Sequence, residues 1–411
     1  MKMSKDLPFG ATELQATLSG SGQMLPAAAY TDPDVLAWEN SHFFSAGWVC
    51  IGRAEDLSET GDRRAYAIGD DGVLVVRGVD GELRGFFNTC RHRAHELLPC
   101  GGQGSGKYIR CPYHAWVFTT EGDLHGVPPA HAADVPDLSQ HSLNAVRVEE
   151  WHGYVMVNVS GDAPPLADYF KGLDDVVGRY TLERLRVGDT HSYTLETNWK
   201  LIVENYHECF HCPTVHPELC RVSDPDEGDF LIGEGAYIGG GMLLREGVTT
   251  MSLDGSSNGV PIPGLTATQL RDVHYIQMFG NLLVSLHPDY VMVHRVVPLS
   301  PDRTFVECQW LFPPEAFDQP DFDPAYAVDF WDITNRQDWT ACESVQRGVG
   351  SRGYQPGPLS SFHEAAVRGF LSMVARSYIS GNLPASVQDI FDSAQFTPSY
   401  GSPTPSADRI G

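Results

Sequence analysis

Asn88-Thr89-Cys90-Arg91-His92-Arg93 and Cys111-Pro112-Tyr113-His114-Ala115-Trp116 are the two segments that say most about the fold of this chain. Each segment pairs one cysteine with one histidine, as Cys90-x-His92 and Cys111-x2-His114, and glycines and turn formers fill the stretch between them. Two thiolates and two imidazoles can hold a metal centre. A zinc site uses these donors, and so does an iron–sulfur cluster in which two histidines replace two cysteines. The segments therefore predict a domain built around a metal.

The residues around the four ligands separate these two alternatives. Both segments resemble the cluster loops of the Rieske iron–sulfur family, including Pro112 and Tyr113, which shield the second loop there. The resemblance implies a 2Fe-2S cluster held by Cys90, His92, Cys111 and His114. Such a cluster passes single electrons at a higher potential than an all-cysteine cluster. Ala94 and Ala115 depart from the family, because many relatives have glycine there and a methyl group disfavours a positive φ.

The composition is that of an ordinary globular protein, since 42% of the 411 residues are apolar, and the length allows two domains. The chain has no basic start followed by an apolar run and no stretch long enough to span a bilayer, so we expect a cytoplasmic protein without membrane contact. Nine irregularly spaced cysteines predict thiols that pack or bind metal rather than a disulfide scaffold. The net charge of -25 argues against nucleic acid as a partner.

A second ligand cluster lies in the middle of the chain. His207-Glu208-Cys209-Phe210-His211 formally matches H-E-x-x-H, the zinc peptidase motif, in which both histidines project from one helical face. Glu208-x2-His211-x4-His216 overlaps it and uses different ligands. Pro213 favours a break after His211, because a residue before a proline avoids the α region. A helix of polar residues without a metal is the third alternative.

The longer run from Asn198 to Glu218 resembles the mononuclear iron site of the Rieske non-haem iron oxygenases. In this resemblance His211 and His216 are iron ligands, Glu208 is a bridging carboxylate, and His207 lies outside the ligand set. Two histidines and one carboxylate leave other positions of the metal open for O2 and substrate. The Rieske motif upstream has no role in a peptidase, which favours the oxygenase interpretation.

The third iron ligand is expected to be a carboxylate far downstream. Asp338 begins the pattern Asp-x3-Cys-Glu-x2-Gln, which resembles the corresponding helix of the oxygenases. Asp332 and Glu343 are the competing carboxylates, and without the resemblance each of the three would be an ordinary solvated helical residue.

The predicted fold is α+β, with a small all-β Rieske domain and a larger catalytic domain whose antiparallel sheet is flanked by helices. Short apolar runs separated by Gly-Asp turns after Trp48 predict the strands of the first domain. In the second we expect a helix around 166–180, strands near 190–197 and 281–313, and a long helix over 324–347. The predicted segments are an N-terminal arm on the catalytic domain (1–40), the Rieske domain (41–160), the mononuclear iron domain (161–395) and a flexible tail (396–411).

Most of the chain resembles the large, or alpha, subunit of a Rieske oxygenase. The resemblance implies a homotrimer in which Glu208 connects a Rieske histidine of one subunit to the iron ligand His211 of the next. The glycine run at 233–241 does not match a nucleotide fingerprint. We therefore expect electrons to come from a partner, which the family implies is a flavin-containing NAD(P)H reductase, and to be used with O2 on a small-molecule substrate.

The substrate expectation also comes from resemblance. Glu208 and the run Glu-Cys-Phe-His-Cys-Pro look more like the glycine betaine and carnitine oxygenases than like ring-dihydroxylating relatives, many of which have Asp at this position. The resemblance implies hydroxylation or N-demethylation of a quaternary ammonium compound with release of formaldehyde. An aromatic-ring hydroxylating oxygenase acting on a small aromatic acid is the alternative, and a pure electron carrier is the competing class.

Aromatic faces can hold a quaternary ammonium group. The aromatic residues available in the catalytic half are Tyr206, Phe210, Tyr275, Phe279, Tyr290 and Trp310, for each of which core packing is the simpler role. His287 and His294 mark the two ends of an apparent strand, and we expect them to be structural unless one faces the substrate.

Overall fold

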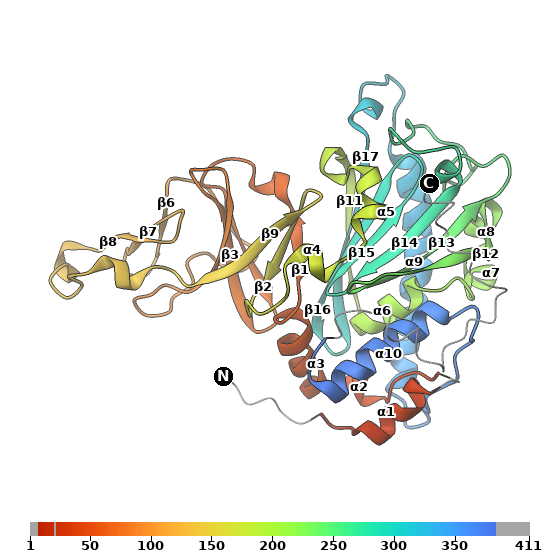
Figure 1. Cartoon of the computed structure of the whole chain (residues 1–411), viewed down its shortest axis with the longest axis horizontal. Coiled ribbons are helices and arrows are strands. Elements are labelled where there is room, and N and C mark those ends of the chain that lie inside the picture. Colours follow the sequence, from red (N-terminus) through yellow and green to blue (C-terminus); the bar gives the residue numbers. More distant parts are fainter. Residues whose placement is uncertain (1–6, 20–21, 384–411) are drawn as a thin grey trace. The chain divides into compact units, whose positions relative to one another are not determined.

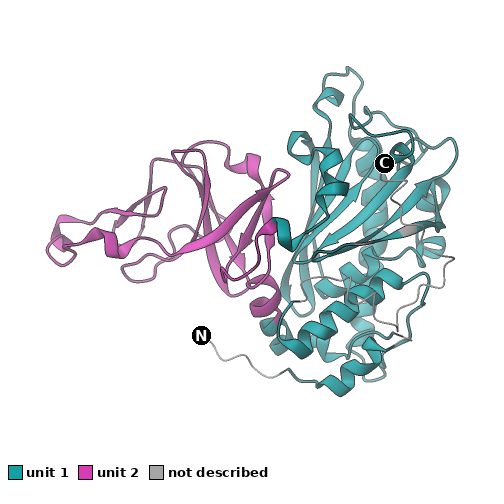
Figure 2. Cartoon of the chain, viewed as in Figure 1, with its two compact units in different colours: residues 1–38, 167–411 teal, residues 39–166 magenta. Residues whose placement is uncertain are grey.

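The computed structural model describes residues 7–19 and 22–383, and the predicted tail 396–411 lies outside them. The chain divides into two compact units (Figure 2). The small unit comprises residues 39–166, and the large unit joins residues 1–38 to residues 167–411. The N-terminal segment therefore belongs to the same unit as the second half of the chain.

The small unit is built from antiparallel strands, as predicted. Its seven-stranded sheet has the order β1 (Val49–Arg53), β10 (Tyr154–Asn158), β9 (Ala145–Trp151), β4 (Leu83–Phe87), β3 (Asp71–Arg77), β2 (Arg63–Ile68), β5 (Gln103–Gly104). A three-stranded sheet contains β6 (Tyr108–Arg110), β7 (Val117–Thr119) and β8 (Leu124–Gly126). Gly69, at φ 57°, lies in the turn between β2 and β3, where a left-handed residue suits a tight hairpin. Cys90 and Cys111 are buried in the core that these sheets share.

The large unit contains a second antiparallel sheet of seven strands (Figure 1). Its order is β11 (Arg186–Leu195), β17 (Arg303–Phe312), β16 (Val291–Ser300), β15 (Leu282–Leu286), β14 (Asp272–Met278), β13 (Tyr237–Leu244), β12 (Ser223–Ile232). The longer helices against it are α6 (Trp199–Tyr206), α9 (Ala325–Val349) and α10 (Ala365–Ser380), which contact β16, β11 and β13 respectively. The shorter helices are α1 (Ala11–Leu18), α2 (Ala28–Thr31), α3 (Pro33–Glu39), α4 (Leu166–Tyr169), α5 (Asp174–Val177), α7 (Cys212–Val215) and α8 (Pro217–Val222). The predicted α+β class is confirmed.

One helix prediction is wrong. The helix expected around 166–180 is broken into α4, α5 and a short 3-10 turn. Gly172 lies between α4 and α5 at φ 85°, a left-handed conformation that ends an α-helix. The long helix predicted over 324–347 is confirmed as α9, whose buried residues recur at intervals of three and four along one face. No described helix is both long and apolar enough to cross a membrane.

Candidate active site

The two Cys-His loops of the small unit have the same backbone pattern. In the first loop the Cys90 N–H donates to the His95 carbonyl (2.9 Å), and the Ala94 N–H donates to the Cys90 carbonyl (3.0 Å). The second loop repeats both bonds: the Cys111 N–H donates to the Trp116 carbonyl (2.8 Å), and the Ala115 N–H donates to the Cys111 carbonyl (3.1 Å). Each loop therefore folds back over its cysteine in the same way.

These loops bring the four predicted cluster residues together. The Cys90 thiol lies next to that of Cys111, and burial, together with this neighbour, raises the pKa of the Cys90 thiol to about 11. The rings of His92 and His114 lie 4.7 Å apart, and Trp116 stacks on His92. Nδ1 of His92 is buried without a hydrogen-bond partner among the described residues. Two thiols beside two imidazoles match the donor set of a mixed-ligand iron–sulfur cluster.

Ala94 and Ala115 adopt φ values of 58° and 56°, so both loops keep the left-handed turn despite the methyl groups. An alanine in this conformation costs about 1–2 kcal/mol, whereas glycine adds only about 0.4–1 kcal/mol of chain entropy to the unfolded state. We expect Ala94→Gly and Ala115→Gly each to raise the free energy of unfolding by up to about 1 kcal/mol, measured by chemical denaturation of the cluster-loaded protein. Ala67→Gly is the control, because Ala67 is an exposed residue of strand β2 and its replacement should destabilise.

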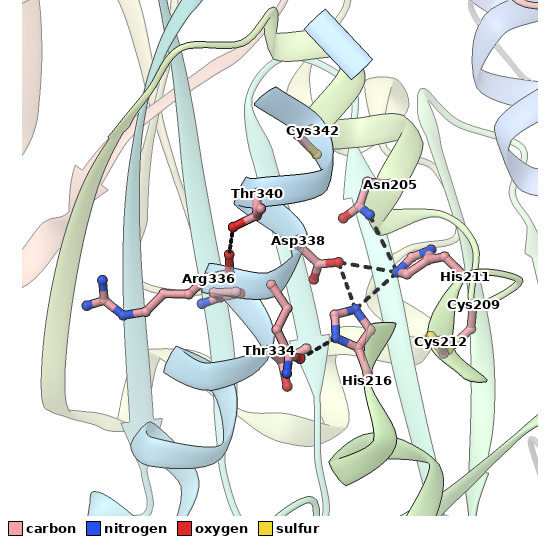
Figure 3. A network of polar contacts seen from close by, with 12 residues as sticks. Asn205, Cys209, His211, Cys212, His216, Thr334, Arg336, Asp338, Thr340 and Cys342 are labelled. Carbon is pink, nitrogen blue, oxygen red and sulfur yellow. Dashed lines mark hydrogen bonds and ion pairs between the residues drawn. A yellow bond between two sulfur atoms is a disulfide. The ribbon is translucent and has the colours of Figure 1, made fainter. Parts of the chain in front are cut away.

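The second site lies in the large unit, where the segment after α6 faces α9 (Figure 3). His211 precedes α7, His216 lies between α7 and α8, and Asp338 projects from the middle of α9. Nε2 of His211 lies 3.1 Å from Nε2 of His216, and Oδ1 of Asp338 lies 3.2 and 2.8 Å from these two nitrogens. Two donors on adjacent positions of one metal, each about 2.1 Å from it, lie about 3.0 Å apart. The three atoms therefore have the spacing of a two-histidine, one-carboxylate metal site.

Neighbouring groups orient both imidazoles toward this point. Oε1 of Glu208 lies 2.5 Å from Nδ1 of His211, and Oε1 of Gln337 lies 2.7 Å from Nδ1 of His216. A hydrogen bond at Nδ1 leaves Nε2 free to bind a metal. Burial lowers the pKa of His211, but the bonds to Asp338 and Glu208 outweigh it and raise that pKa to about 10 in the metal-free chain. Two carboxylates beside one imidazole thus favour a cation at this position.

Comparisons with known proteins assign both parts of the chain to known domain families. Residues 47–146 match the family model of the Rieske 2Fe-2S domain, and residues 182–380 match that of the ring hydroxylating alpha subunit catalytic domain. The glycine betaine monooxygenase oxygenase subunit of Chromohalobacter salexigens is 30% identical over 87% of this chain and 86% of its own length. The chain belongs to the Rieske non-haem iron oxygenases. It is an oxidoreductase with a Rieske cluster and a mononuclear iron, and an oxygenase subunit of this family receives its electrons from a reductase.

Two further relatives of this oxygenase carry related names. The carnitine monooxygenase oxygenase subunit of Acinetobacter baumannii is 27% identical over 80% of this chain and 86% of its own length. A crystal structure of the quaternary ammonium Rieske monooxygenase CntA with an inhibitor superposes with a TM-score of 0.74 at 24% identity, covering 91% of this chain and 99% of that one. At 24% identity, the similarity to this crystal structure shows the fold alone.

The remaining histidine of the H-E-x-x-H match does not reach the metal site of this oxygenase. Helix α6 ends at Tyr206, so His207 and His211 do not share a helical face. His207 is buried and its Nε2 lies 2.8 Å from Oε1 of Gln277 on β14. Burial lowers its pKa to about 4, which keeps the imidazole neutral. His207 is therefore a buried structural residue.

The two competing carboxylates are engaged elsewhere. Asp332 accepts hydrogen bonds from Tyr193 (2.7 Å) and Arg336 (2.7 Å), while Glu343 accepts one from the backbone of Glu196 (3.1 Å). Asp332 also contacts His191, and among the described interactions only Asp338 of the three carboxylates contacts His211 and His216. Gln337 was missed by the sequence analysis, because an amide beside Asp338 has no spacing signal of its own.

The rest of the Asp-x3-Cys-Glu-x2-Gln pattern holds α9 against the start of α6. The Cys342 carbonyl accepts from Thr197, and Oε1 of Gln346 accepts from the Asn198 N–H at 2.9 Å. The side-chain oxygen of Asn198 caps α6 by accepting a hydrogen bond from the Lys200 N–H. The Asn198 amide nitrogen donates to the carbonyls of Tyr30 (3.2 Å) and Pro301 (2.6 Å). These buried bonds set the position of Asp338 relative to the histidines that follow α6.

Asn198→Ala should therefore destabilise the site from a distance. It removes one helix cap and two further buried hydrogen bonds, each contributing about 1 kcal/mol. We expect the free energy of unfolding to fall by about 2–3 kcal/mol, with lower iron occupancy at equal added iron. Asn198→Ser is the matched variant, because its hydroxyl can still accept the cap bond from Lys200 while the two bonds donated by the amide are lost. An unchanged Tm in Asn198→Ala would contradict this role.

One cysteine pair departs from the expectation of unpaired thiols. Cys209 and Cys212 form a disulfide, and Phe210 and His211 lie between these two cysteines in the sequence. It is a local bridge rather than a scaffold, since seven other cysteines are free. His211, Cys212 and His216 offer ligand atoms within 4.8 Å of one another. Asp338 fits the third ligand position better, because the Cys212 sulfur is already bonded.

The aromatic candidates divide into two groups. Phe210 is 56% exposed, Phe279 packs near Phe370, and the Tyr290 hydroxyl donates to the Met251 carbonyl at 2.8 Å. Tyr206, Tyr275 and Trp310 lie instead between the sheet and its helices, with His287 and His294 beside them.

Proposed function

We propose that this oxygenase uses O2 and electrons from a flavin-containing NAD(P)H reductase to hydroxylate a carbon next to the nitrogen of a quaternary ammonium compound such as glycine betaine. The observation that carries the chemistry is the convergence of His211 Nε2, His216 Nε2 and Asp338 Oδ1 within 3.2 Å of one another. The substrate rests on the relative from Chromohalobacter salexigens, which is named for glycine betaine. We further propose that the protein is cytoplasmic.

His211, His216 and Asp338 would hold the iron, which when bound supplies the activation of O2. Cys90, His92, Cys111 and His114 would hold the cluster that delivers electrons. Hydroxylation of an N-methyl group takes two electrons, two protons and one O2, inserts one oxygen atom into a C–H bond and yields water. The product, an N-hydroxymethyl cation, loses a proton and formaldehyde, leaving the tertiary amine.

Glu208 would link the two centres in a homotrimer. Its carboxylate accepts hydrogen bonds from the backbone of Phe210 and His211 and from Nδ1 of His211. A carboxylate has about four lone-pair sites, so one site remains for a donor from a neighbouring subunit. A Rieske histidine, His92 or His114, would be that donor.

The substrate proposal is tested by supplying reductase, NADH and one compound at a time: glycine betaine, carnitine, choline or a small aromatic acid. We expect formaldehyde and dimethylglycine from glycine betaine in proportion to NADH consumed. A hydroxylated aromatic acid without formaldehyde would contradict the proposal.

A further inference from the structure

Several buried polar groups between the sheet and helices of the large unit make no hydrogen bond to any described residue. They are the Tyr275 hydroxyl, both ring nitrogens of His287, Nδ1 of His294, and the indole nitrogens of Trp310 and Trp339. Buried donors and acceptors are nearly always paired, because an unpaired one costs stability. A group of them in one place therefore indicates an interaction with something other than the chain.

Strand pairing puts these groups on one face of the sheet. Tyr275 pairs with Ser285, Ser285 with Met292, and Met292 with Trp310. Residues opposite one another in an antiparallel pair share a face, and so do residues two apart along a strand. His294, two residues after Met292 on β16, therefore lies on this face too. His287 follows the end of β15, and its ring lies 6.3 Å from that of Tyr275. It is the face toward α6, because the Tyr206 hydroxyl lies 3.0 Å from Oγ of Ser285.

A row of rings connects this face to the iron site. Trp339 follows the ligand Asp338 on α9 and lies 6.2 Å from His294. The next ring separations are 6.3 Å from His294 to Tyr206, 5.9 Å from Tyr206 to Tyr275, and 6.3 Å from Tyr275 to His287. One end of the row is therefore beside a metal ligand, and His287 lies at the other end. None of the five residues of this row is a lysine or an arginine.

Two rings of this row keep some accessible surface. Tyr206 and Tyr275 are only half-buried although the Tyr275 hydroxyl is buried. On the neighbouring strand Gly240 pairs with Tyr275, so no side chain stands beside the ring on that face. Gly240 belongs to the glycine run at 233–241, which lacks a nucleotide fingerprint.

We propose that Tyr275 and His287 hold the end of the substrate that accepts hydrogen bonds, a carboxylate, while its cationic end lies toward Asp338. This inference rests on the proposed function and narrows the substrate from quaternary ammonium compounds to betaines. His287 is completely buried, and burial lowers its pKa well below the usual value, so its ring is neutral with one N–H donor. That donor and the Tyr275 hydroxyl suit a carboxylate. Both residues are specificity determinants rather than catalytic residues.

Binding to the iron-replete, oxidised protein tests the proposal by calorimetry with two cations, glycine betaine and ethyltrimethylammonium, which lacks the carboxylate. Tyr275→Phe removes only the hydroxyl, and His287→Phe keeps a ring that can stack on Tyr290. We expect each variant to raise the Kd of glycine betaine about tenfold or more and to leave that of ethyltrimethylammonium unchanged. Equal weakening of both cations, or no weakening of either, would overturn the proposal.

The stability of the ligand-free protein gives an independent readout. Tyr290→Phe is the matched control, because the Tyr290 hydroxyl donates to Met251 and accepts from Trp331. We expect Tyr290→Phe to lower the Tm and Tyr275→Phe to leave it unchanged or raise it. A similar fall in both variants would show that the Tyr275 hydroxyl already has a partner in the fold, which overturns the proposal.

If the wild-type protein binds neither cation, the proposed function fails. The carboxylate anchor is then tested by comparing the affinity of benzoate with that of toluene, which lacks the carboxylate. Weaker binding of benzoate alone in the two variants would support the anchor. An unchanged affinity for benzoate would overturn it.

Discussion

Asp338→Ala is expected to abolish iron binding at the mononuclear site and, with it, turnover. The replacement removes one of three converging donors and leaves His211 and His216, whose Nε2 atoms lie 3.1 Å apart, without the carboxylate that contacts both. Changes outside the ligand set already cost about 10- to 100-fold in metal affinity, so loss of a ligand should exceed 100-fold. Iron per subunit and substrate-dependent O2 uptake measure the effect. The Rieske absorption should remain, because Cys90 and Cys111 lie in the other compact unit.

Asp332→Asn is the matched control on the same helix. Asp332 bonds Tyr193 and Arg336 and contacts neither His211 nor His216 among the interactions of the described residues. This variant should keep both iron and turnover. If Asp338→Ala retained full iron while Asp332→Asn lost it, the assignment of Asp338 would be wrong.

Glu208→Gln is expected to retain both metal centres and still lose about 10- to 100-fold in turnover. The amide oxygen of glutamine can accept the bond from Nδ1 of His211, which keeps the imidazole oriented, while the amide NH2 group loses the two backbone hydrogen bonds that the second carboxylate oxygen accepts. The amide cannot supply the negative charge that would pair with a cluster histidine of a neighbouring subunit. Reoxidation of the reduced cluster by O2 and substrate, followed by stopped-flow absorbance, should slow by the same factor as turnover.

Glu343→Gln serves as its control, because the hydrogen bond that Glu343 accepts among the described residues comes from the backbone of Glu196. It should leave the reoxidation rate unchanged. Normal cluster reoxidation in Glu208→Gln, or loss of iron from it, would contradict the bridging role.

The sequence predicted the small unit well because metal loops need particular residues at particular spacings. Cys90-x-His92 and Cys111-x2-His114 are close in sequence, and turn residues reveal the strands around them. Ala94 and Ala115 were expected to disfavour a left-handed turn, yet both adopt it, because the surrounding hydrogen bonds from Cys90 and Cys111 determine the loop. Local propensity is therefore overridden by the loop as a whole.

Long-range features were harder to predict. Asp338 was predicted as a ligand by resemblance, whereas its contacts depend on how Gln346 and Asn198 hold two distant helices together. The Cys209–Cys212 disulfide and the unpaired groups of Tyr275 and His287 follow from three-dimensional placement, which no spacing along the chain encodes. The prediction of one helix over 166–180 is wrong because Gly172 adopts a left-handed backbone conformation, which separates α4 from α5.

The most direct test of the central claim is a single turnover. Protein with a chemically reduced cluster, prepared with and without iron at the second site, is mixed with O2 and glycine betaine, and cluster reoxidation and formaldehyde are followed together. We predict fast reoxidation with formaldehyde only when both iron and glycine betaine are present. Formaldehyde formed equally without iron, or reoxidation that is independent of every quaternary ammonium compound tried, would contradict the account.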